Sequence, residues 1–188
     1  MLRLSAKAFG ECRASTAVTL DEMLRAREER VAWQTASLAQ FGKPLISVTV
    51  VMPGPVKDGW LPRRVMEVAL DELDAMIGAN KWSLLSREVL WRNTGPEAIY
   101  VIGTDALILK SATIDLEERH PMGRLWDLDV ITTAGAALSR SQLSRPARRC
   151  LICDRPAREC GRSLRHSLPD LLERISKMVD SLGLHTGT

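Results

Sequence analysis

The sequence predicts an α+β fold in which helices flank a mixed sheet. Two observations lead to this prediction. Short apolar runs rich in β-branched residues are typical of strands, and longer stretches between them repeat apolar residues at helical spacing. The chain has 188 residues, of which 45% are hydrophobic and 26% charged, so it is long enough to bury a sizeable core. We expect residues 1–188 to form a single domain that includes a Cys-containing segment at 145–166 and a C-terminal helix at about 168–182.

The N-terminal half carries clear signals for helices and a strand. Thr19 and Glu22 form a capping-box sequence that begins a helix, and Gly42 is placed to end it. Residues 45–51 are β-branched and mostly apolar, which predicts a buried strand that the following prolines stop. A second amphipathic helix is predicted from Pro62, because proline is favoured in a first helical turn.

The central part of the chain predicts a hairpin and a third helix. Residues 82–91 and 99–102 have the composition of strands, and the turn-forming residues 93–96 lie between them. Residues 105–118 fit a helix, which we favour, although 112–116 would also fit a strand.

The C-terminal part continues with a strand, a turn and the last helix. The strand carries Asp127 and Asp129, and the small residues 133–135 after it predict a hairpin turn. Ser167 is a suitable N-cap for the last helix, and Gly183 is suited to end it.

Asp127 and Asp129 are the strongest candidates for a functional site. Side chains alternate along a strand, so both carboxylates point to one face while the apolar residues beside them face the other layer. Mg²⁺ prefers a few hard oxygen ligands and keeps positions for substrate phosphates, so the pair predicts a magnesium site. A solvated strand face is the alternative. The flanking apolar residues favour function, and they indicate a central strand.

Two groups just before this strand are candidates for a general base. His120 and Glu118 carry side chains that accept protons, and Glu117 beside them is a further possible metal ligand. A solvated helix end is the competing interpretation of His120.

Four cations are candidates for binding a phosphate-bearing substrate. Lys57 and Arg124 each follow a glycine-containing turn, where the backbone can approach a ligand closely, and Arg148 and Arg149 lie in the Cys-containing segment. Arginine grips phosphate oxygens with a planar fork of donors, whereas lysine acts as a point charge. Most surface cations are only solvated, which is the alternative for all four.

Cys150, Cys153, Cys160 and His166 form a second candidate site. Three thiolates and one imidazole complete a tetrahedral zinc site, and a C-x2-C pair often begins one. The spacing beyond the first pair is unusual. We therefore favour reduced, partly buried cysteines and keep Zn²⁺ as the less favoured alternative.

The composition narrows the function classes. A formal net charge of +3 is too small to predict nucleic-acid binding by itself. No apolar run approaches the roughly 18 residues needed to span a bilayer, so we expect no membrane segment and a cytoplasmic location. The clustered cysteines do not resemble the framework of a small secreted disulfide protein.

Three segments of the chain carry motifs of a known family. They are Met52-Pro53-Gly54-Pro55-Val56-Lys57-Asp58, His120-Pro121-x-Gly123-Arg124-Leu125-Trp126-Asp127-x-Asp129-Val130 and Arg148-Arg149-Cys150-Leu151-x-Cys153. In order and spacing they resemble the apo-citrate lyase phosphoribosyl-dephospho-CoA transferase family. The similarity extends from about Leu20 to Leu182.

This resemblance implies a single transferase domain and a defined reaction. The protein is expected to transfer the prosthetic group from 2'-(5''-triphosphoribosyl)-3'-dephospho-CoA to a serine of the apo acyl carrier (gamma) subunit of citrate lyase, with release of pyrophosphate. The related malonate decarboxylase transferase is described as nucleotidyltransferase-like with an essential Asp pair. The resemblance therefore implies that role for Asp127 and Asp129, and a nucleotidyltransferase-like fold.

The resemblance also suggests roles for the other candidates. Arg124, Lys57 and Arg148 or Arg149 would stabilise the departing pyrophosphate, and His120 or Glu118 would accept the serine proton. Two other functions stay open: a non-catalytic zinc-stabilised binding module, and a metal-dependent transferase that uses another nucleotide donor.

Overall fold

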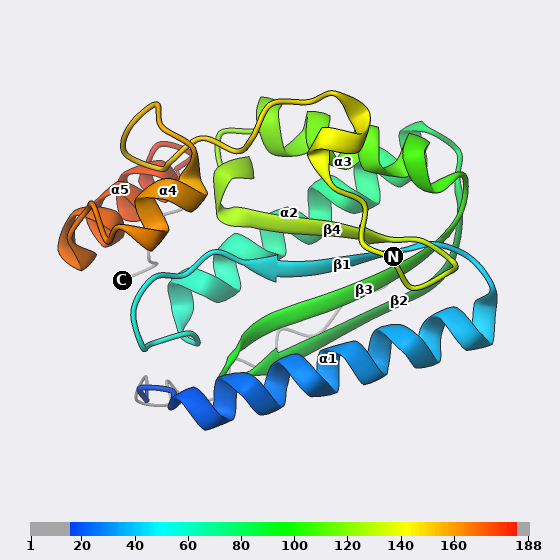
Figure 1. The fold of residues 1–188 in the computed structure, drawn as a ribbon, viewed down its shortest axis with the longest axis horizontal. Coiled ribbons are helices and arrows are strands. Elements are labelled where there is room, and N and C mark those ends of the chain that lie inside the picture. The colour runs from blue at the N-terminus through cyan, green and yellow to red at the C-terminus, as the bar shows by residue number, and fades with distance from the viewer. Residues whose placement is uncertain (1–15, 184–188) are drawn as a thin grey trace, which may run out of the picture.

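The computed structural model describes residues 16–183, which form a four-stranded sheet with helices on both faces. Figure 1 shows α1 along one face of the sheet and α2 and α3 along the other. In chain order the elements are α1 (Leu20–Phe41), β1 (Leu45–Val50), α2 (Trp60–Ala79), β2 (Ser83–Arg92), β3 (Gly95–Gly103), α3 (Ala106–Arg119), the 3-10 turn η1 (Gly123–Leu125), β4 (Trp126–Ile131), the 3-10 turn η2 (Arg140–Leu143), α4 (Ala157–Arg162) and α5 (Leu168–Asp180).

The strands have the order β2-β3-β1-β4, and every pairing among them is antiparallel. The predicted α+β class is confirmed, but the sheet is antiparallel where we expected a mixed one. Helices α2 and α3 connect strands that run in the same direction, yet another strand always lies between the two, as in a split β-α-β arrangement. The expected nucleotidyltransferase likeness rests on the resemblance alone.

Local capping explains where the helices begin and end. In α1, the Thr19 hydroxyl accepts from the Glu22 amide and the Glu22 carboxylate accepts from the Thr19 amide, which confirms the capping box. Gly42 ends the helix with a φ of 60°, a conformation that glycine adopts without strain. Residues 106–119 are helical, as favoured, because Asp105 caps them through the amides that follow it.

The face covered by α2 and α3 holds the larger hydrophobic core. Ile46 of β1, Tyr100 of β3 and Leu128 of β4 pack there with Leu73 of α2. Ile175 of the C-terminal helix α5 belongs to the same core, and all five side chains are 0–1% exposed. This face therefore supplies most of the hydrophobic stabilisation of the fold.

The face covered by α1 has a smaller apolar cluster. Leu45, Ile99, Val101 and Ile131 form it, and partly buried residues at the C-terminal half of α1 pack against them. Beyond this cluster, the side chains that β1 and β4 direct toward α1 are polar.

Strand β4 lies at an edge of the sheet, although its apolar flanks predicted a central position. Two buried charged side chains of α3 cover its free edge. Lys110 Nζ donates to the Leu128 carbonyl at 3.1 Å, and the Leu128 amide donates to Glu117 Oε1 at 3.0 Å. Lys110 and Glu117 are only 5% and 4% exposed, so the backbone of β4 is covered at Leu128 although the strand lies at the edge. No helix of residues 16–183 is long and apolar enough to cross a membrane.

Candidate active site

Two rows of polar side chains cross the sheet on the face that α1 covers. Asp127 lies opposite Thr49 of β1, which in turn lies opposite Glu97 of β3. Asp129 lies opposite Ser47 in the next row. Paired residues of antiparallel strands share a face, so all of these side chains project to the same side of the sheet. The structure thus brings the two predicted carboxylates together on one face.

The Asp127 and Asp129 carboxylates repel each other. The Asp127 side chain is 46% exposed, and Asp129 is exposed as well. Desolvation by the surrounding protein, followed by the charge of Asp127, raises the pKa of Asp129 above its ordinary value. A bound divalent cation would relieve this repulsion, and carboxylate oxygens are the ligands that Mg²⁺ prefers. The donor set therefore fits this ion.

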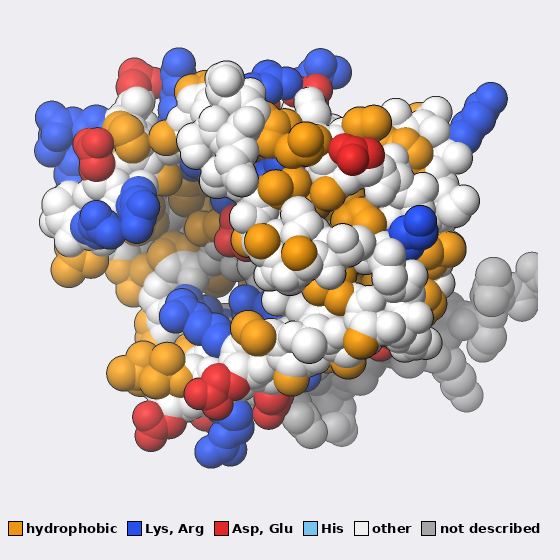
Figure 2. Space-filling model, turned by 45° about the vertical axis from the view of Figure 1, so that its right-hand side comes forward, with side chains coloured by type: hydrophobic (Ala, Val, Ile, Leu, Met, Phe, Trp, Pro, Cys, Tyr) orange, Lys and Arg blue, Asp and Glu red, His pale blue; other side chains and the backbone are white. Residues whose placement is uncertain are grey.

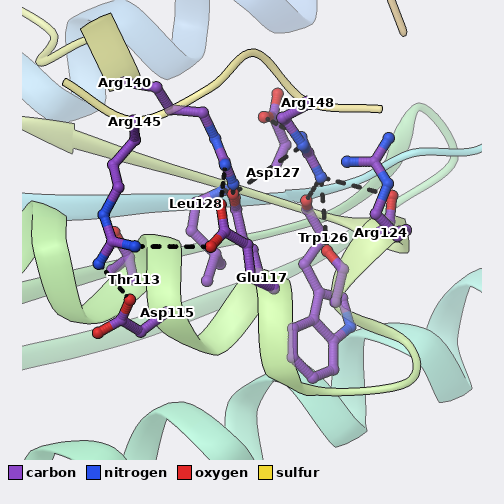
Figure 3. A network of polar contacts seen from close by, with 12 residues as sticks. Thr113, Asp115, Glu117, Arg124, Trp126, Asp127, Leu128, Arg140, Arg145 and Arg148 are labelled. Atoms are coloured by element: carbon purple, nitrogen blue, oxygen red, sulfur yellow. Dashed lines mark hydrogen bonds and ion pairs between the residues drawn. The ribbon is translucent and has the colours of Figure 1, made fainter. Parts of the chain in front are cut away.

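Arg148 contacts the carboxylate pair from the segment that follows η2, as Figure 3 shows. Its Nη1 donates to Asp127 Oδ1 at 3.0 Å, and its Nη2 donates to the carbonyl oxygen of Trp126. The same nitrogen lies 3.4 Å from the carbonyl oxygens of Gly123 and Arg124. The Arg148 Nε is buried and has no hydrogen-bond partner within the described chain. This Nε lies 3.9 Å from Glu117 Oε2, so the guanidinium is held between two carboxylates and the backbone carbonyl oxygens.

Arg124 lies in η1, directly before β4. It is half-buried, and its Nε also lacks a hydrogen-bond partner within the described residues. Desolvation and the charge of Arg148 lower its pKa. Gly123 allows this position, because a Cβ there would lie 2.3 Å from the carbonyl oxygen of Glu117. Two desolvated arginines that share a location are suited to bind an anion.

The other two predicted cations lie differently. Lys57 Nζ donates to the Met52 carbonyl at 2.5 Å, in the loop that follows β1. Burial, and then the charge of Arg27, lower the pKa of Lys57. Arg149 is 76% exposed and lies 3.6 Å from a carboxylate oxygen of Asp154. Lys57 is therefore tied to Met52, and Met52 lines the same pocket as Arg124, whereas Arg149 lies at the surface.

His120 lies on the opposite side of β4 from the carboxylate pair. Its ring stacks on Trp126 with the ring centroids 4.5 Å apart, and its Nδ1 accepts from the Met122 amide at 3.1 Å. The Trp126 side chain faces the helical layer, where its Nε1 donates to the Val65 carbonyl at 3.1 Å. The structure does not bring His120 and Asp127 together.

The glutamates next to His120 are engaged in ion pairs. Arg140 donates to a carboxylate oxygen of Glu117 and, at 2.7 Å, to Glu118 Oε1. Figure 3 shows the Arg140 guanidinium at Glu117, and Arg145 reaching Asp115 of the same helix at 2.6 Å. These contacts fasten the 140–148 segment along α3, and so they also help to position Arg148.

Helix α1 contributes two polar side chains to this face that were not predicted from the sequence. Gln34 Nε2 donates to Ser47 Oγ at 2.8 Å. Arg30 pairs with Glu97 at 2.7 Å, and Glu97 is only 2% exposed. The signal was present in β1, where Ser47 and Thr49 interrupt an apolar run with period two.

Cys150, Cys153, Cys160 and His166 converge on one point. Their ligand atoms all lie within 4.8 Å of one another. Cys153 Sγ is 3.5 Å from Cys160 Sγ and 3.4 Å from His166 Nε2. Tetrahedral zinc with bonds of about 2.3 Å to sulfur places its sulfurs about 3.8 Å apart, so the cluster fits such an ion. A cluster of four possible metal ligands is therefore present, although we favoured unconnected cysteines from the sequence.

A carboxylate pair with Arg124 and Arg148 beside it supplies the kinds of group that enzymes use to neutralise charge on phosphate esters. Comparison with known proteins defines the family. Residues 18–182 match the family described as apo-citrate lyase phosphoribosyl-dephospho-CoA transferase. The chain belongs to this family, as the resemblance indicated.

Curated relatives agree with this assignment. A protein of this description from Citrobacter koseri is 45% identical over 163 residues, which cover 87% of this chain and 89% of the relative. Relatives of the same description from Escherichia coli and Shigella boydii are each 42% identical over 166 residues, covering 88% of this chain and 91% of the relative.

Proposed function

We propose that this protein transfers the prosthetic group of 2'-(5''-triphosphoribosyl)-3'-dephospho-CoA to a serine of the apo acyl carrier subunit of citrate lyase, with release of pyrophosphate. The match of residues 18–182 to the transferase family carries this proposal. The chemistry of the β4 site supports it, because the reaction needs positive charge around a triphosphate. The residues themselves do not exclude a related nucleotide donor, which the same assay tests.

In the proposed mechanism, the serine oxygen of the carrier attacks the phosphorus nearest the ribose in line with the departing pyrophosphate. The bond from this phosphorus to the pyrophosphate breaks, and the serine proton is lost to solvent. Arg124 and Arg148 bind the phosphate oxygens, and Lys57 adds positive charge nearby. Asp127 and Asp129 are the residues that would hold Mg²⁺, which supplies charge neutralisation on polyphosphates when it is bound. Positioning and electrostatic stabilisation account for most of the catalysis in such a transfer.

The position of Arg148 suggests how the site responds to the donor. Its guanidinium now contacts Asp127 at 3.0 Å. A triphosphate competes for the same guanidinium, since phosphate oxygens accept bidentate hydrogen bonds from arginine. We propose that donor binding moves Arg148 from Asp127 to the phosphates and so frees the carboxylate. In this mechanism His120 has a packing role against Trp126.

We also propose that Cys150, Cys153, Cys160 and His166 hold a structural Zn²⁺. Four protein ligands leave no open position for substrate, which is typical of structural zinc. Free thiols as metal ligands suit a reducing compartment, which supports a cytoplasmic location. Metal analysis of the purified protein tests the site. We expect one equivalent of zinc in the wild type and its loss in Cys153→Ser.

The proposed activity is tested by intact-mass spectrometry of the apo carrier after incubation with this protein, Mg²⁺ and the donor. We expect a mass gain equal to the donor minus pyrophosphate. A carrier whose acceptor serine is changed to alanine is the control and should gain nothing. No gain with the wild-type carrier, together with stoichiometric zinc, would instead support the zinc-stabilised binding module.

A further inference from the structure

We propose that an apolar pocket beside the β4 site binds the adenine ring of the donor. This inference rests on the proposed function and deepens it by assigning one part of the donor to one place. The pocket has a volume of about 300 Å³, which is at the lower end of the range for small-molecule sites. It lies between the loop after β1 and the Cys/His cluster.

The lining of this pocket suits a flat, mostly apolar group. Met52 and Pro53 contribute from the loop after β1, and Leu164 and Leu171 contribute from the C-terminal part. Its charged side chains are arginines, which can stack on a base as well as bind phosphate. Figure 2 shows a hollow on this side of the molecule with Lys and Arg side chains gathered along it. A larger hollow of about 640 Å³ beside α1 carries charges of both signs, among them Glu22, so it suits a planar base less well.

The pocket shares a wall with the proposed reaction site. Arg124 and Arg148 line the pocket, and Arg148 also contacts Asp127. The Arg124 guanidinium has a buried Nε without a hydrogen-bond partner in the described chain, whereas the Arg148 Nε lies 3.9 Å from Glu117 Oε2. A ligand here thus has its apolar group within reach of groups that bind phosphate. In the donor, the triphosphoribosyl group is attached to the 2' position of the adenosine. The adenine is therefore closer to the transferred phosphate than the pantetheine end is.

Leu164 presents an exposed apolar side chain at this pocket from a strained backbone position. Its side chain is at the pocket and is 84% exposed, and its backbone has a φ of 46°. A non-glycine residue in this left-handed region is strained, and an exposed leucine gives the fold nothing in return. The Arg165 amide, which donates to the Cys160 carbonyl at 3.1 Å, holds the strained turn in place. A bound base that covers Leu164 explains why an apolar side chain is presented here.

The Cys/His cluster connects this pocket to the proposed zinc. Cys150, Cys160 and His166 belong both to the cluster and to the pocket wall. A metal ion that fixes these three residues also fixes the turn that carries Leu164. The zinc would then act on the reaction through donor binding, without contact with the reacting phosphates.

The test compares Leu164→Gly with Lys81→Gly in the mass-spectrometric transfer assay. Lys81 also has a positive φ, of 55°, and is exposed away from the pocket, so its change relieves similar strain without touching the ligand. We expect Leu164→Gly to raise KM for the donor about tenfold, since one apolar side chain contributes about 1.5 kcal/mol when buried. Its melting temperature should stay equal or rise, and its zinc content should be unchanged. Lys81→Gly should leave KM for the donor unchanged. Leu164→Met, which keeps an apolar side chain at this position, should have the KM of the wild type.

Two competitors identify the part of the donor that occupies the pocket. We expect ADP to inhibit wild-type transfer competitively and to inhibit Leu164→Gly about tenfold less well, whereas phosphopantetheine should not compete. An unchanged KM in Leu164→Gly, or competition by phosphopantetheine alone, would overturn the adenine assignment. If the wild type shows no transfer, the proposed function fails. Calorimetric titration with ADP then still decides the pocket, because ADP carries the adenine without the pantetheine, and only a pocket that binds adenine loses affinity for it in Leu164→Gly.

Discussion

The two faces of the sheet differ in what stabilises them and in what they offer to a substrate. The face under α2 and α3 is apolar almost throughout and includes side chains such as Leu73 and Tyr100 that are completely buried. On the other face, only two residues of α1, Ala26 and Ser37, are buried, and polar rows lie along β1 and β4. One face thus supplies most of the stability, which allows the other to carry carboxylates that folding alone would not favour.

The largest effect should come from Asp127→Asn on the polar face. We expect transfer to fall by roughly 100- to 1,000-fold, because the substitution removes a charge from the site where phosphate charge is neutralised. The melting temperature should change little, since the Asp127–Arg148 pair is partly exposed. Asp154→Asn is the control, as its side chain is 99% exposed near the Cys/His cluster. Full activity in Asp127→Asn would remove this face from the mechanism.

The matching experiment on the apolar face is Leu73→Ala. Leu73 is completely buried, so its truncation should lower the free energy of unfolding by about 2–5 kcal/mol. Activity per folded molecule should stay as in the wild type. Leu24→Ala in α1, whose side chain is 46% exposed, should cost less than about 1 kcal/mol. Denaturant titrations of the two variants measure the difference, and equal losses would contradict the division between the faces.

Gly123→Ala affects the connection between the faces. The new Cβ would meet the Glu117 backbone at 2.3 Å, so we expect a loss of about 1–3 kcal/mol in unfolding free energy. Transfer should fall as well, because Arg124 moves with its turn. Gly78→Ala in α2 meets nothing within 4 Å and should stabilise the protein by about 0.5–1 kcal/mol. A stable and active Gly123→Ala would show that the close packing is not required.

The smallest effect on stability, and the only stabilising one on the polar face, is predicted for Asp129→Asn. The raised pKa of Asp129 means that the folded state binds more protons than the unfolded state at pH values just above the ordinary value of 3.8. Its contribution to stability therefore falls as the pH rises through this window and stays low at neutral pH.

Asparagine removes this penalty. The variant should be more stable than the wild type at pH 7, by less than about 1 kcal/mol because the group is exposed, and equal to it below pH 3.8. Transfer should nevertheless be lost. Thermal unfolding at a series of pH values measures the effect. A variant that is less stable than the wild type at pH 7 would contradict the repulsion between Asp127 and Asp129.

Much of the fold could be predicted because its signals are local. The capping box at Thr19 and the C-cap at Gly42 depend on a few neighbouring residues, and each is found where the sequence indicated. The turn predicted at 93–96 is shorter than expected, because β3 already begins at Gly95. The strand order depends on contacts distant in sequence. Burial of Lys110 and Glu117 over the edge of β4 is such a contact, and from the sequence these residues resemble an ordinary helix surface.

The candidate site was predictable to a similar degree. Alternation along β4 correctly placed Asp127 and Asp129 on one face, and the same alternation separates them from Trp126, on which His120 stacks. Its proximity in sequence suggested that His120 acts together with Asp127 and Asp129, but strand β4 lies between its ring and the two carboxylates. The pairing of Arg30 with Glu97 joins α1 to β3 across 67 residues, which no local pattern specifies.

The covered edge of β4 has a consequence for behaviour at high concentration. An open edge strand is a template on which another chain can add a strand and begin aggregation. Lys110 and Glu117 occupy the backbone groups of Leu128 on that edge, so a foreign strand would have to displace two buried charges to pair there. On the opposite edge, β2 has an irregular register between Leu84 and Ser86, which twists a strand away from regular pairing. Both ends of the sheet thus resist intermolecular strand addition.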